Sequence, residues 1–275
     1  MTDIFKYKTQ AMSKLLNHAS SGYVHYKSGT VSLGKANSLR QKFIENYSID
    51  LDKDRRTRWK FNGLTTTHLV MYFCPHDKLV HWFLMSSEGE GLIFDKPDDP
   101  MRDLRDRNQR LKVTAPVKKY SETSEPPAYE MIRYTGWVKD KHGKKVRSVI
   151  RFSWQYDKRT MENYEKQLGL AVHRMTTKNM TKKNKTWCGN DKLLLSMLES
   201  IRHTPGFHKS RRQAIALWQH ARRRWRKQSD SAWPYGGFTK AGLSRFKTEI
   251  KYDADHYLRI EKQKEEKIFR GVRAA

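Results

Sequence analysis

The chain has 275 residues, of which 56 are Lys or Arg and 29 are Asp or Glu, so its net charge is +27. Its 8 tryptophans, 13 tyrosines and 11 phenylalanines exclude a disordered polycation, because such a chain has too few large apolar side chains to build a core. The 2 cysteines, neither in a CxxC pair, exclude a disulfide framework and a cysteine-rich zinc site. We therefore expect a folded cytoplasmic protein with a strongly anionic partner.

Helices are expected in the first fifty residues. Residues 4–16 read as a short helix, and apolar side chains recur at helical spacing between residues 32 and 47. A basic run follows at residues 53–60 and ends in an Asn-Gly turn. The N-terminus has no secretion signal, and no later apolar stretch is long enough to cross a bilayer, so we expect no membrane partner.

The middle of the chain has the alternation of β-structure. Residues 67–73 and 79–86 predict one hairpin, and residues 129–139 and 145–156 predict a second. In the last of these strands a mostly apolar face alternates with a partly basic one. The polar stretch between the hairpins holds the main acidic run of the chain: Glu88, Glu90, Asp95, Asp98 and Asp99.

The last 120 residues favour helices. Helical periodicity and end signals place them at residues 160–175, 191–203, 208–228 and 238–269. The predicted fold is therefore α+β, with two N-terminal helices, an antiparallel sheet built from β-hairpins and a C-terminal bundle of about four helices. We expect a domain boundary after the second hairpin, dividing the chain into residues 1–157 and 158–275, with one continuous core as the alternative.

The helix at 208–228 is the strongest candidate for a binding site. Ala214, Trp218, Ala221 and Trp225 are spaced to form one core-facing stripe. The rest of its surface is basic, with eight cations and no acid in nineteen residues. Those cations repel one another by a few tenths of a kcal/mol per close pair unless phosphates neutralise them. The alternative is a solvated face whose charges favour the helix dipole. The cations are Lys209, Arg211, Arg212, Arg222, Arg223, Arg224, Arg226 and Lys227.

Three further basic clusters are candidate nucleic-acid contacts. A basic hairpin can enter a groove or follow a phosphate backbone, although lysines also guard exposed sheet edges against aggregation. Trp59 and Trp187, each beside a basic cluster, are candidates for stacking on bases, with a place in the core as the alternative. The cations are Lys139, Lys141, Lys144, Lys145, Arg147 and Arg151 on the second hairpin, Lys182, Lys183 and Lys185 near Trp187, and Arg55, Arg56 and Arg58 near Trp59.

The sequence predicts no catalytic residue, metal site or cofactor. His68, His76 and His81 lack the spacing of metal ligands, and strand histidines with satisfied hydrogen bonds are expected instead. The acidic run offers carboxylates that could hold Mg²⁺ for phosphodiester cleavage, with a solvated loop as the alternative. No Walker lysine loop or GxGxxG motif is present.

Several short motifs in the C-terminal half resemble basic proteins encoded by plasmids and integrative conjugative elements. The motifs are Gly136-Trp137, Phe152-Ser153-Trp154, Tyr164-Glu165, Leu193-Leu194-Leu195, Thr204-Pro205-Gly206-Phe207 and Arg223-Arg224-Trp225-Arg226. The resemblance implies an accessory role in DNA transfer, replication or maintenance, and it identifies no catalytic residue.

We therefore expect a non-catalytic protein that binds nucleic acid, DNA ahead of RNA, together with other protein subunits. A metal-dependent nuclease or nicking enzyme that uses the acidic run is one alternative. An RNA-binding subunit of a ribonucleoprotein is the other.

Overall fold

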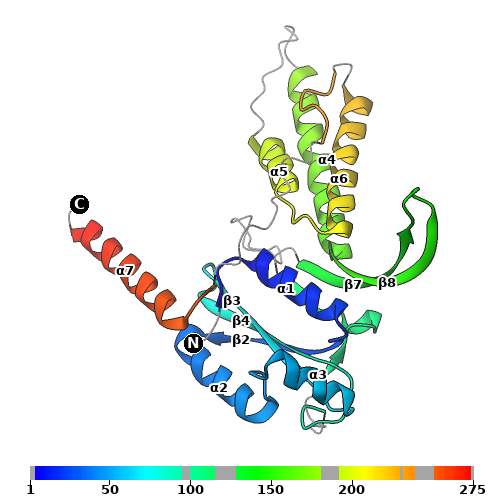
Figure 1. Ribbon diagram of the computed structural model, residues 1–275. Helices are drawn as coiled ribbons and strands as arrows, with labels where there is room; N and C mark the ends of the chain where they lie inside the picture. Colours follow the sequence, from blue (N-terminus) through cyan, green and yellow to red (C-terminus); the bar gives the residue numbers. More distant parts are fainter. Residues whose placement is uncertain are drawn as a thin grey trace. The chain divides into compact units, whose positions relative to one another are not determined.

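The computed structural model describes residues 4–94, 100–114, 128–180, 192–229, 232–238 and 251–273. The chain combines helices with two largely antiparallel sheets, which confirms the predicted α+β class (Figure 1). The chain folds as two compact units. The first unit comprises Met1–Leu111, Ile132–Phe152 and Phe246–Ala275, and the second comprises Lys112–Met131 and Ser153–Arg245.

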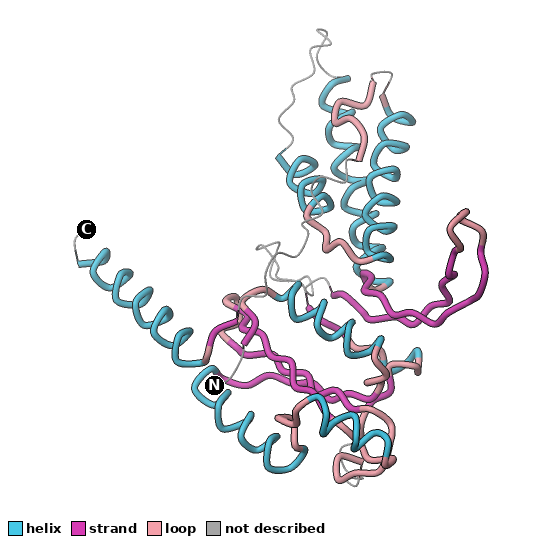
Figure 2. The backbone as a smooth tube through the Cα atoms, in the orientation of Figure 1, coloured by secondary structure: helices cyan, strands magenta, loops and turns pink. Residues whose placement is uncertain are grey.

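A six-stranded sheet forms the centre of the first unit (Figure 2). Its strand order is β5-β2-β4-β3-β1-β9, and the pairing is antiparallel except between β1 and β3. The predicted first hairpin is present as β3 and β4, with Thr67 opposite Ser86 and Cys74 opposite Leu79. The strands are β1 (Ile4–Phe5), β2 (His25–Ser32), β3 (Thr67–Cys74), β4 (Leu79–Ser86), β5 (Arg102–Asp103) and β9 (Lys251–Tyr252).

Helices cover both faces of this sheet. Figure 1 shows α1 (Lys8–Ser20) on one face and α2 (Ala36–Tyr47) on the other. From α1, Met12 and Leu15 are fully buried, because apolar residues recur along one side of that helix. Phe43 and Ile44 of α2 pack against a cluster that includes Leu84. The unit also contains α3 (Lys53–Phe61) and the 3₁₀ turns η1 (Leu33–Lys35) and η2 (Arg107–Gln109).

The end of the chain differs from the expected single helix over residues 238–269. The structure has β9 followed by α7 (Ala254–Arg273), and both belong to the first unit. β9 pairs antiparallel with β1, and Ala254 and Tyr257 pack with Met71 and Phe73 of the central sheet. The apolar stripe expected to join a C-terminal bundle therefore covers the N-terminal sheet, because that sheet has an edge and an apolar face to bury.

The second unit is a helical bundle joined to a small sheet. Its helices are α4 (Lys158–Met180), α5 (Lys192–Arg202) and α6 (His208–Gln228). The sheet has the order β6-β7-β8, with β6 (Lys112–Thr114), β7 (Ala128–Lys139) and β8 (Lys145–Tyr156). Only β6 and the base of the β7–β8 hairpin belong to the second unit, because Ile132–Phe152 belong to the first. The predicted division at residue 157 thus differs from the observed one, because the base of the second hairpin packs with the helices that follow it.

Apolar stripes of three helices form the core of the bundle. Ala214, Trp218, Ala221 and Trp225 of α6 are buried, which confirms the stripe predicted from their spacing. They pack with Leu168, Ala171 and Val172 of α4 and Leu194, Met197, Leu198 and Ile201 of α5. In the part of the chain that the structure describes, no helix is long and apolar enough to cross a membrane.

Candidate nucleic-acid interface

Hydrogen bonds to the base of the β7–β8 hairpin fix the rotation of α6. The Gln213 side chain donates to the carbonyl of Tyr156 at 3.0 Å and accepts from the backbone N–H of Tyr156 at 2.7 Å. The backbone N–H of Lys209 donates to Ser153 Oγ at 3.1 Å. Since these contacts and the buried tryptophans hold one side of α6, its other side faces solvent.

The basic side chains of α6 cover the solvent-exposed surface of the helix, which we call the α6 basic face. Each of its seven outermost cations is exposed, and Lys209 at the start of the helix is half-buried. In the described part of the chain, Arg222, Arg223 and Arg226 form no ion pair with a carboxylate. His220 lies between this face and the core, and its pKa is lowered first by burial and then by Arg224 and Arg223. The exposed members are Arg211, Arg212, Arg222, Arg223, Arg224, Arg226 and Lys227.

The distal half of the second hairpin is exposed on both faces. Asp140 Oδ1 accepts from the backbone N–H groups of His142 and Lys144, and Gly143 takes the left-handed conformation that the turn requires. The predicted apolar face is exposed as well: Val146 is 63% exposed and Ile150 58%. The exposed cations of this arm are Lys141, Lys144, Lys145, Arg147 and Arg151; the side chain of Lys139 lies outside the described set.

The three arginines of α3 do not form one patch. Arg55 and Arg58 are exposed, whereas Arg56 is half-buried and donates from Nη2 to the carbonyl of Ile49 at 2.8 Å. Asp52 caps the helix by accepting from the backbone N–H of Arg55 at 2.7 Å. Helical spacing thus divides the predicted cluster between two faces. The half-buried Trp59 and the exposed Phe61 adjoin it, and Lys182, Lys183, Lys185 and Trp187 lie outside the described residues.

A pair of histidines that sequence reasoning did not connect lies near α3. His68 of β3 stacks on His18 of α1, with ring centroids 4.0 Å apart. Burial, followed by nearby cations, lowers the pKa of His18 to about 3 and that of His68 to about 2. The sequence places Lys14 and His18 on one side of a helix, and Arg56 and Lys60 on one side of another. It does not indicate that these two helices lie close to each other.

One group of three potential metal ligands occurs in the described part of the chain, at the β3–β4 turn. Ligand atoms of Cys74, Asp77 and His81 lie within 4.8 Å of one another. Asp77 Oδ2 contacts His81 Nε2 at 2.8 Å, and its Oδ1 accepts from the Leu79 backbone N–H at 3.0 Å. Both oxygens of Asp77 therefore already stabilise the turn. The carboxylate at the start of the acidic run, Glu88, pairs with Arg105, while Asp95, Asp98 and Asp99 lie outside the described residues.

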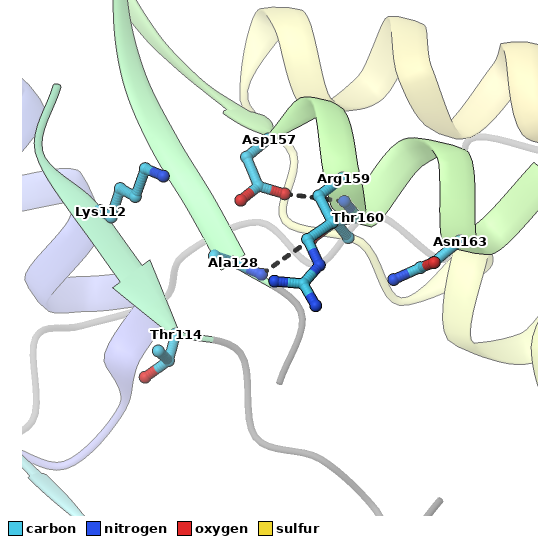
Figure 3. Close-up of a pocket in the computed structure, with 7 residues that line it drawn as sticks. All are labelled: Lys112, Thr114, Ala128, Asp157, Arg159, Thr160 and Asn163. Carbon is cyan, nitrogen blue, oxygen red and sulfur yellow. Dashed lines mark hydrogen bonds between the residues drawn. The ribbon is translucent and has the colours of Figure 1, made fainter. Parts of the chain in front are cut away.

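A cavity of about 300 Å³ opens beside the first turn of α4 (Figure 3). Asp157 accepts from the backbone N–H of Thr160 at 2.8 Å, and Thr160 Oγ1 accepts from the backbone N–H of Ala128 at 3.0 Å. A carboxylate thus occupies the helix N-terminus, where an anion would otherwise bind. The lining residues are Lys112, Thr114, Ala128, Asp157, Arg159, Thr160 and Asn163.

The structure therefore places the α6 cations on the exposed surface of one helix, leaves the hairpin cations on an exposed arm and separates the α3 arginines. The α6 basic face offers many positive donors to an extended polyanion. Comparisons with protein-family models, with curated proteins and with solved structures find no match to this chain.

Proposed function

We propose that this chain binds nucleic acid, DNA ahead of RNA, through the α6 basic face. In this proposal it is a non-catalytic accessory subunit of a cytoplasmic assembly that serves the transfer, replication or maintenance of a mobile element. The observation that carries the binding role is the exposed cationic face that lies opposite the buried Trp218 and Trp225. The resemblance to plasmid-borne and conjugative-element proteins supports DNA as the partner.

The density of charge on α6 matches that of duplex DNA. The five cations between Arg222 and Lys227 occupy about 7.5 Å of helix axis at 1.5 Å per residue. Over that length duplex DNA carries about four phosphate charges, one per 1.7 Å. Arginine suits this role because its planar guanidinium donates two parallel hydrogen bonds to phosphate oxygens.

Replacing Arg222, Arg223 and Arg226 together by Ala tests the proposal. For the wild type we expect the logarithm of the affinity for duplex DNA to fall with the logarithm of salt concentration at a slope of about −5 to −7. The variant should weaken binding to every sequence and make that slope shallower by about 2 to 3, one for each lost phosphate contact. Fluorescence anisotropy at several salt concentrations measures both.

The matched control replaces Lys35, Arg40 and Lys42 by Ala, which removes the same charge from the first unit. This control should keep the wild-type slope. A wild-type slope shallower than about −2, or equal effects of the two triple variants, would mean that the α6 basic face is not the interface. Parallel titrations with single-stranded DNA and RNA decide between the DNA proposal and an RNA-binding subunit.

A further inference from the structure

The stacked histidines lie at a junction of three elements of the first unit. His18 lies in the last turn of α1 and is only 8% exposed, and His68 lies on β3. The ring of Tyr23 lies 4.5 Å from that of His68 and makes edge contact with His18 at 5.7 Å. The Tyr23 hydroxyl accepts from Thr66 Oγ1 at 3.1 Å. These contacts give the two imidazoles a fixed position.

Three cations act on the two rings. Lys14 lies one helical turn before His18 on α1, and Arg56 and Lys60 lie one turn apart on α3. Lys60 Nζ lies 3.9 Å from the centroid of the Tyr23 ring. All three cations lower the pKa of both histidines, and among the described groups that shift these two pKa values none is a carboxylate. The cluster therefore combines three positive charges and two neutral imidazoles.

Arg56 also has an unused donor. Its Nε is buried without an acceptor in the described part of the chain, although its Nη2 is bonded to the Ile49 carbonyl. A buried guanidinium N–H without an acceptor is unfavourable, because it has lost its hydrogen bond to water and gained none in exchange. An acceptor with several oxygens and negative charge would satisfy this N–H, receive an N–H from each neutral imidazole and offset the three cations.

We propose that Arg56, Lys60, His18 and His68 bind a single phosphate group, either a phosphodiester of a nucleic-acid strand or free inorganic phosphate. Phosphate fits because it presents several acceptor oxygens and one or two negative charges to donors of a fixed geometry. If the bound group is a phosphodiester, the inference rests on the proposed nucleic-acid binding; if it is free inorganic phosphate, it does not. The phosphate centre comprises residues of the first unit, whereas the α6 basic face belongs to the second.

A titration of the full chain with sodium phosphate, followed by NMR of the imidazole ring signals, tests the site. We expect saturable shifts of the His18 and His68 signals that sodium chloride of equal ionic strength does not produce. The bound anion should also raise the pKa of both rings, since it opposes the cations around them. If phosphate and chloride shift the wild-type ring signals equally, the proposal is wrong.

Two variants locate the site. Arg56→Gln with Lys60→Gln should weaken phosphate binding at least tenfold, whereas Arg58→Gln removes a cation from the other side of α3 and should bind as the wild type does. Thermal unfolding checks that each variant is folded. Equal phosphate affinity of the double variant and the wild type would contradict the assigned donors.

A short DNA strand that carries only internal phosphodiesters distinguishes the two sources. Ring shifts with this strand identify a nucleic-acid contact, and shifts with inorganic phosphate alone identify a free-phosphate site. The Arg222, Arg223 and Arg226 variant should keep the phosphate-induced shifts, because it leaves this centre intact. If the wild type fails to bind DNA while phosphate still shifts the rings, the proposed function fails and the phosphate site stands.

Discussion

His18 and His68 make the stability of the first unit sensitive to mild acid. Their pKa values in the folded chain, about 3 and about 2, lie below the 6.5 of an unperturbed histidine, chiefly because of burial. As the pH falls below about 6.5, these histidines take up protons in the unfolded chain but stay neutral in the folded chain. The free energy of unfolding therefore decreases as the pH falls. His18 can lower the free energy of unfolding by at most ~1.4 kcal/mol for each pH unit below its unfolded pKa.

We predict a lower urea midpoint at pH 5 than at pH 7 in a phosphate-free buffer. Other groups change the stability little between pH 7 and pH 5. Lys8, with a pKa of about 7 in the folded chain, is mostly protonated in the folded and the unfolded chain over most of this pH range. Carboxylates with lowered pKa values, such as Asp77, lose their contribution to the stability only below about pH 4. His68→Gln should reduce the difference between the two midpoints, while the exposed His76→Gln should preserve it. A midpoint that does not change between pH 7 and pH 5 would show that the pair is not held neutral.

Residue-level predictions held where one helix supplied all the information. The spacing of Ala214, Trp218, Ala221 and Trp225 defined a buried stripe, and the structure buries each of them. His68 was expected to be an ordinary strand histidine, but its surroundings come from α1 and α3 as well as from its own strand. Long-range contacts of that kind leave no periodic signal in the sequence.

Among the elements, the second hairpin is a candidate second contact for DNA. Replacing Lys144, Lys145 and Arg147 by Thr keeps β-propensity, and the turn persists because Asp140 bonds to backbone groups. We predict weaker duplex binding and a salt slope shallower by about 2 to 3, measured by the same anisotropy titration. The control replaces the exposed Val146 and Ile150 by Thr and should leave the slope unchanged.

The alternative role of these cations is protection of an exposed edge. In that case the triple Thr variant would bind DNA with the wild-type slope but would aggregate at lower protein concentration. Light scattering on the same samples separates the two roles.

The placement of α7 shows the limit of element-level prediction. Its apolar period correctly indicated a helix, but its partners Met71 and Phe73 lie almost 200 positions earlier in the chain. β9 has only two residues and acquires its strand conformation by pairing with β1. A short edge strand of this kind has no alternation for a sequence pattern to detect.

At the scale of the whole molecule, the proposed binding role depends on an excess of cations. Residues 201–275 carry 19 cations and 7 acids, whereas a metal-dependent nuclease needs free carboxylates that converge on an ion. Glu88, at the start of the acidic run, is paired with Arg105, whose guanidinium also bonds to Asp103 at 2.7 Å. Glu88 and Asp103 thus share one arginine in this structure.

We predict that the full chain does not nick supercoiled plasmid DNA in the presence of Mg²⁺, and that Asp98→Ala with Asp99→Ala binds duplex DNA as tightly as the wild type. The physical reason is that binding depends on cations that neutralise phosphates, whereas these two carboxylates only repel the phosphates. Agarose gels with Mg²⁺ and with EDTA measure nicking, and anisotropy measures binding.

If the wild type nicks DNA in the presence of Mg²⁺ and the double variant does not, the protein is a nuclease and not a non-catalytic accessory protein. Nicking retained in the double variant would place the metal ligands outside the acidic run.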